Sequence, residues 1–220
     1  MQHVVERIDP FENAQAVVPE IDAGTKSAQF GVLFVQRHVP AVLAQRDRGR
    51  QAGETRTGEA IMKAAANGVR PVSLELGGKN AGIIFDDADL DKTLEGIGRA
   101  CFANTGQVCL GTERLYVQRG IYDRICEGLA AKAAGYVMGD PFEDATTMGT
   151  VISAEHRDKV LGYYDQDREG GATILAGGGA AEVAGYAGGY WVQPTVWTGL
   201  AEDHAVVTDE IFGPCTHICA

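Results

Sequence analysis

From residue 53 onward the chain alternates short apolar runs with longer stretches whose apolar residues recur at helical spacing. The pattern predicts strands at 72–76, 81–85, 114–118, 172–176, 190–196 and 216–220, and helices at 58–66, 90–101, 121–136 and 153–164. Asp86 or Asp87 is expected to cap the helix that begins near Leu90. The run 81–85 is continuously apolar, which is typical of a strand covered on both faces. Strands that alternate with helices favour an α/β fold with a mostly parallel sheet.

Composition places the chain among ordinary globular proteins. Of its 220 residues, 45% are hydrophobic and 22% are charged, values that argue against disordered and fibrous classes. The formal net charge of −11 disfavours nucleic acids and anionic membrane surfaces as partners. Glycine is unusually frequent, at 29 residues, so many tight turns or close backbone approaches are expected.

The cysteines and histidines do not form a metal or disulfide pattern. Five cysteines are present, no CxxC occurs, and the histidines are scattered, so we expect neither a disulfide framework nor a metal site. No apolar stretch approaches the ~20 residues of a membrane span, and the N-terminus lacks the apolar core of a signal peptide. A cytoplasmic location is therefore expected.

Two residues are candidates for chemistry on local grounds. Cys109 follows the polar, glycine-containing turn 104–108, where backbone N–H groups could favour its thiolate, although a single cysteine is more often an inert core residue. Glu75 lies at the end of a predicted strand beside Gly77 and Gly78, where partial desolvation would suit a general base. The alternative for Glu75 is a solvent-facing position of an alternating strand.

Two further segments carry weak signals when each is taken alone. Residues 53–58, with a glycine at each end, precede a predicted helix and could approach a phosphate, but their spacing is not that of a known phosphate loop. Residues 210–214 place an acidic and an aromatic side chain beside a sharp turn.

Taken together and in order, these segments resemble the aldehyde dehydrogenase superfamily. Residues 74–79 (LELGGK) are similar to the general-base segment of the family, and 102–109 (FANTGQVC) to its nucleophile segment. Residues 210–214 (EIFGP) are similar to its downstream cofactor segment, and 193–195 (QPT) to one of its strands. The stretch 106–116 leans toward the 2-hydroxymuconic semialdehyde dehydrogenase-like branch.

The resemblance implies NAD(P)-dependent oxidation of an aldehyde to a carboxylic acid, with NAD as cofactor and NADP as the alternative. Cys109 would be the nucleophile and Glu75 the base. Glu210 and Phe212 would contact the nicotinamide riboside, and Gly53 and Thr55 would lie near the pyrophosphate. A small-molecule aldehyde would be the substrate, and the intact family forms homo-oligomers.

Departures from the family indicate an internal fragment. The resemblance begins near Gly53, so we divide the chain into an unassigned segment (1–52), a remnant of the Rossmann-like cofactor domain (53–76) and a C-terminally truncated catalytic domain (77–220). Nothing upstream resembles the family asparagine of the oxyanion hole or its ribose-binding lysine. Two alternatives follow: a catalytically inactive fragment, as a non-catalytic module or a disrupted gene product, and a Cys109 thiol that only hydrolyses thioesters or esters slowly.

Overall fold

The computed structural model describes residues 52–220, so all but the last residue of the unassigned segment 1–52 lies outside it. The described chain begins with helix α2 (Ala52–Ala66), strand β1 (Asn80–Ile84) and helix α3 (Leu90–Phe102). The elements that follow are η1 (Ala103–Gly106), β2 (Thr112–Val117), η2 (Arg119–Ile121), α4 (Tyr122–Ala134), α5 (Ala154–Glu169), β3 (Thr173–Ala176), β4 (Thr195–Thr198), α6 (Ala205–Thr208) and β5 (Cys215–Cys219).

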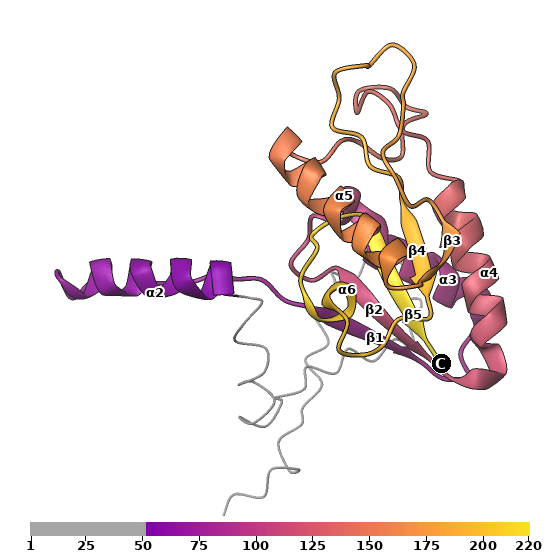
Figure 1. Ribbon diagram of the computed structural model, residues 1–220, viewed down its shortest axis with the longest axis horizontal. Helices are drawn as coiled ribbons and strands as arrows, with labels where there is room; N and C mark the ends of the chain where they lie inside the picture. The colour runs from indigo at the N-terminus through magenta and orange to yellow at the C-terminus, as the bar shows by residue number, and fades with distance from the viewer. Residues whose placement is uncertain (1–51) are drawn as a thin grey trace, which may run out of the picture.

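The strands form one mixed sheet in the order β1-β2-β5-β4-β3 (Figure 1). β1, β2, β5 and β4 run parallel, and β3 pairs antiparallel with β4 at the edge. The expected α/β fold with a mostly parallel sheet is therefore confirmed. The strand predicted at 216–220 is β5, which lies in the middle of the sheet.

Two apolar cores cover the two faces of the sheet. α3 and α4 pack on one face, where Ile125 and Leu129 of α4 are fully buried. α5 and α6 pack on the other, where Tyr164 of α5 meets Trp197 of β4 edge to face. The two cores share β4, because its successive residues Val196 and Trp197 point to opposite faces. The described chain contains no helix long and apolar enough to cross a bilayer.

Three local predictions were wrong in the chain around β1. Residues 72–76 form no strand, because an extended segment becomes a strand only where a neighbour supplies a hydrogen-bond ladder, and β1 pairs only with β2 among the described strands. For the same reason β1 is an edge strand, and Phe85 beyond it is 54% exposed rather than covered. The cap of α3 is Asp89, whose side chain accepts a hydrogen bond from the Lys92 amide, and not Asp86 or Asp87.

Two elements also begin five or six residues away from the expected position. α2 begins at Ala52 rather than at Gly58, so the segment expected to precede this helix forms its first turns. β4 begins at Thr195 rather than at residue 190, since Pro194 has no N–H to contribute to a ladder.

Asp167, on the buried side of α5, is an isolated acid in the second core. It is 1% exposed, and neither carboxyl oxygen has a hydrogen-bond partner in the part of the chain that the structure describes. Burial raises the pKa of this carboxyl from 3.8 to about 7, against the lowering effect of Lys79 and Arg168. Between these two pKa values the folded chain holds a proton that the unfolded chain has lost, so stability falls as pH rises through this range and is level above it.

Asp167→Asn should therefore stabilise the fold at about pH 8 by on the order of 1–3 kcal/mol, since it removes an uncompensated buried charge. The gain should shrink as the pH is lowered toward about 5, where the wild-type carboxyl is already neutral. Urea unfolding across this range measures it. Asp165→Asn, at an exposed position of the same helix, is the control and should give a small, nearly pH-independent change. An Asp167→Asn variant no more stable than wild type at pH 8 would contradict this assignment.

Candidate active site

The topology of the sheet brings the three motif segments to one edge. Residues 74–79 directly precede β1, 102–109 lead into β2, and 210–214 directly precede β5. These three strands are neighbours and run parallel. Parallel strands begin at the same edge of a sheet, so segments that are far apart in sequence meet at the amino ends of β1, β2 and β5.

The nucleophile segment turns sharply after α3. Asn104, Thr105 and Gly106 have φ values of 50°, 57° and 71°, all in the left-handed region. A β-branched residue rarely adopts this conformation, and such strain collects at functional sites. Thr105 is buried, and its hydroxyl donates to the Gly149 carbonyl at 3.4 Å. The turn therefore leaves Cys109 at the start of an exposed bend before β2.

Cys109 differs from the other four cysteines in its exposure. It is exposed, Cys219 is half-buried, and Cys101, Cys126 and Cys215 are buried. Burial raises the pKa of the Cys101 and Cys219 thiols to about 12, with Glu202 contributing at Cys219. Burial also raises the pKa of the Cys126 and Cys215 thiols. The four alternatives to Cys109 are thus held as thiols.

The predicted base segment lies beside the nucleophile segment. The Asn80 side-chain amide donates to the Cys109 carbonyl at 2.5 Å and to the Gly111 carbonyl at 3.2 Å. A side-chain carbon at Gly78 would lie 3.7 Å from the same Cys109 carbonyl oxygen. Glu75, three residues before Gly78, is exposed. The two segments are adjacent, and the role of Glu75 stays a prediction.

The downstream segment is joined to both of the others. The Gly78 amide donates to the Glu210 carboxylate at 3.0 Å, which links the base segment to residues 210–214. At Gly106 a side-chain carbon would lie 1.9 Å from the Gly213 carbonyl oxygen, so the nucleophile turn and the downstream turn touch backbone to backbone. Gly106 is therefore required both by its positive φ and by this contact.

A buried ion pair joins the base segment to β2. The Lys79 ammonium binds the Glu113 carboxylate, and their side chains are only 4% and 8% exposed. Glu113 also accepts from the Ile211 amide at 3.1 Å and from the Phe212 amide at 2.8 Å. The Arg114 guanidinium donates to the Lys79 carbonyl at 2.7 Å.

The sequence interpretation missed Glu113. It had a detectable signal: period-two alternation places Glu113 on the same strand face as Leu115 and Val117, which are buried. A carboxylate at a buried position needs a partner, and Lys79 in the neighbouring segment is that partner.

The structure does not bring every predicted residue together. Gly53 and Thr55 lie in the first turns of α2, which stands apart from the sheet in Figure 1. The described chain thus places them away from the edge where residues 210–214 lie.

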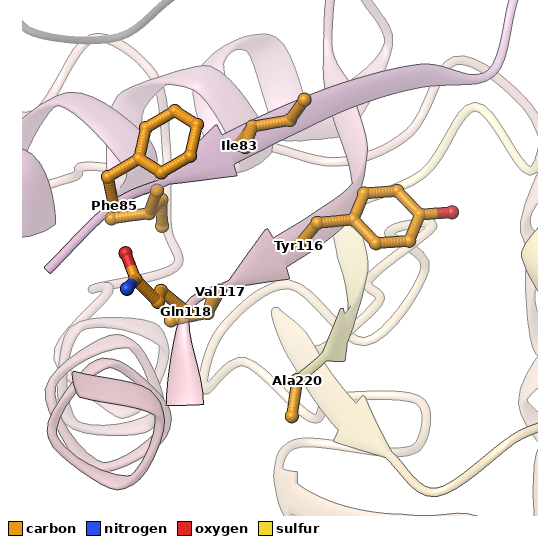
Figure 2. Close-up of a pocket in the computed structure, with 7 residues that line it drawn as sticks. Ile83, Phe85, Tyr116, Val117, Gln118 and Ala220 are labelled. Atoms are coloured by element: carbon orange, nitrogen blue, oxygen red, sulfur yellow. The ribbon is translucent and has the colours of Figure 1, made fainter. Parts of the chain in front are cut away.

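An apolar groove of about 330 Å³ lies at the opposite, carboxyl ends of β1 and β2, between Phe85, Tyr116 and Ala220 (Figure 2). None of the predicted site residues lines this groove.

Comparison with known proteins identifies the family. Residues 50–220 match the model of the aldehyde dehydrogenase family. The chain belongs to this family, and the predicted resemblance is confirmed.

Its curated relatives include semialdehyde dehydrogenases. The chain is 62% identical over 167 residues to 2-hydroxymuconic semialdehyde dehydrogenase of Pseudomonas sp. strain CF600, covering 76% of this chain and 34% of the relative. It is 53% identical to 2-aminomuconic 6-semialdehyde dehydrogenase of Pseudomonas sp., with the same coverage. The chain therefore spans about a third of the length of the curated relatives it matches.

Solved structures of the family share the fold. A betaine aldehyde dehydrogenase double mutant from Staphylococcus aureus, in complex with NAD+ and with a modified cysteine, superposes with a TM-score of 0.71 at 38% identity over 75% of this chain and 33% of that one. The NAD+ complex of an aldehyde dehydrogenase from Bacillus cereus gives 0.70 at 37% identity, over 76% and 33% of the two chains.

Exposure and pKa together predict the order of thiol reactivity. Limited treatment of the folded chain with iodoacetamide should label Cys109 first, at least about tenfold faster than any other cysteine, since only the thiolate reacts and the other thiols are buried or raised in pKa. Peptide mapping measures this. Denatured chain, in which all five thiols should react at similar rates, is the control. Faster labelling of Cys219 or Cys126 in the folded chain would contradict the assignment.

The contact between the two turns predicts a costly substitution. Gly106→Ala should destabilise the fold by more than about 2 kcal/mol, because the new methyl group meets the Gly213 backbone and alanine disfavours a positive φ. Gly149→Ala, where a side-chain carbon meets nothing within 4 Å, should change stability by less than about 0.5 kcal/mol. Thermal unfolding compares the two. Equal stabilities would show that the turns do not touch.

Proposed function

We propose that this chain carries the catalytic thiol and base of an aldehyde dehydrogenase that oxidises a semialdehyde to a carboxylic acid. The observation that supports it most is the convergence of Cys109, the Glu75 segment and residues 210–214 at one edge of the sheet. Membership of the family supplies the reaction class. The semialdehyde substrate follows from the 62% identical relative.

In this proposal the Cys109 thiolate adds to the aldehyde carbon, a carbon–sulfur bond forms, and the carbonyl oxygen becomes an alkoxide. The Cys109 backbone N–H stabilises that alkoxide by a hydrogen bond. Loss of hydride from the same carbon converts the thiohemiacetal to a thioester. Glu75 then removes a proton from water, which attacks the thioester carbon, so that the carbon–sulfur bond breaks and the acid leaves.

Bound NAD supplies the hydride acceptor for this reaction, as it is the ligand named in the related structures. Of this chain, Glu210 would hold the ribose hydroxyls through its carboxylate, and Phe212 would border the nicotinamide. Glu210 and Phe212 belong to a segment held against the turn 104–106 that precedes Cys109. This position suits a nicotinamide that must lie close to the thiol-bound carbon. Gly53 and Thr55 would lie near the pyrophosphate.

A chimera tests the proposal in a full-length setting. The matching 167-residue segment of the Pseudomonas sp. strain CF600 relative is replaced by that of this chain, and NADH formation from a semialdehyde is followed. The chimera should turn over, Cys109→Ala should lower kcat by at least about 10³, and Glu75→Gln by about 10²–10⁴. Cys219→Ala is the matched control and should leave kcat nearly unchanged.

Two results with the chimera variants would contradict the residue roles in the proposal. A Cys109→Ala chimera that keeps its rate would remove Cys109 from the reaction. A Glu75→Gln chimera that keeps its rate would leave Cys109 as nucleophile and would assign the base to another residue.

A further inference from the structure

Phe212 has a backbone conformation that its own side chain opposes. Its φ is +61°, in the left-handed region, which is an outlier for a bulky residue. Such a conformation persists only where surrounding contacts determine it. Phe212 is also the residue that the proposed function places against the nicotinamide, so the contacts that hold it decide where its ring points.

Three hydrogen bonds hold the backbone of Ile211 and Phe212. Its amide donates to Glu113 Oε1 at 2.8 Å, and the Ile211 amide donates to Glu113 Oε2 at 3.1 Å, so one carboxylate takes both N–H groups of consecutive residues. The Phe212 carbonyl accepts from His156 Nε2 at 2.7 Å. Because a carbonyl is only an acceptor, Nε2 must carry the hydrogen in this contact.

The charge of Glu113 is essential to this arrangement. Its carboxylate accepts three donors, the two amides and the Lys79 ammonium, and it is nearly excluded from water. Hydrogen bonds to a buried ionised acceptor are stronger than neutral ones. A glutamine amide could accept at only one of its two ends and would turn a donor toward another donor.

We infer that Glu113 is a positioning residue of this active site. With Lys79 as its counter-ion, it holds Phe212 in the left-handed conformation and so sets Glu210 and Phe212 against the turn 104–106 that precedes Cys109. This inference rests on the proposed function for what Glu210 and Phe212 contact. Glu113 itself lies in neither the nucleophile segment nor the base segment, and it acts through the backbone of 211–212.

Amide hydrogen exchange in the 220-residue chain, without substrate or cofactor, tests the inference. Glu113→Gln should raise the exchange rates of the Ile211 and Phe212 amides by at least about tenfold, while amides of α4 change little. Glu95→Gln, which removes the Glu95–Lys132 ion pair near the surface, is the matched control and should leave both amides unchanged. If Glu113→Gln does not fold, Glu113→Asp takes its place, since it keeps the charge beside Lys79 but shortens the reach.

A double-mutant cycle separates positioning from general stabilisation. Glycine adopts a positive φ without penalty. Adding Phe212→Gly to Glu113→Gln should therefore slow exchange of the Ile211 amide at least about threefold relative to Glu113→Gln alone. If Glu113 only stabilises the core, the two substitutions would act independently. Unchanged exchange in Glu113→Gln, or independent effects in the cycle, would overturn the inference. Because these measurements need no turnover, failure of the chimera would overturn the proposed function and leave this result standing.

Discussion

The parallel pairing of β1, β2 and β5 is the constraint on which the site depends. Ala81 pairs with Arg114 and Arg114 with His217, so these strands start within a few residues of each other along the same edge. Each motif segment is the chain immediately before one of these strands. A register shift of one residue would turn every side chain of a strand to the other face, and the two apolar cores forbid it.

Backbone strain and its compensation lie where the segments meet. Thr105 and Phe212 both have positive φ values, and both lie next to the contact between Gly106 and Gly213. The Thr105 hydroxyl joins its own turn to the Gly149 carbonyl, and the Glu113 carboxylate and the His156 ring hydrogen-bond to the backbone of Phe212. Strained turns held by polar partners give a site with little freedom, which suits a reaction that needs a thiol and a hydride acceptor in fixed positions.

The sequence predicted the parts of this arrangement that depend on local pattern. The helices α4 and α5 and the strands β2, β3 and β5 were expected from apolar spacing, and the turn before Cys109 from its polar, glycine-containing sequence. Residues 72–76 have the alternation of a strand, but whether such a segment becomes one depends on a neighbour that local pattern does not reveal. The role of Glu113 depends on the backbone of residues 211–212, about a hundred positions later, which only the sheet topology brings near.

The proposed reaction depends on a covalent bond between Cys109 and the substrate carbon at this edge of the sheet. The most direct measurement is peptide mapping by mass spectrometry after the chimera is mixed with NAD and a semialdehyde and quenched in acid. We expect an acyl group on the Cys109 peptide, and more of it in the Glu75→Gln variant, because hydrolysis of the thioester is slowed there. An acyl group on another cysteine, or turnover with no adduct at Cys109 in the Glu75→Gln variant, would contradict it.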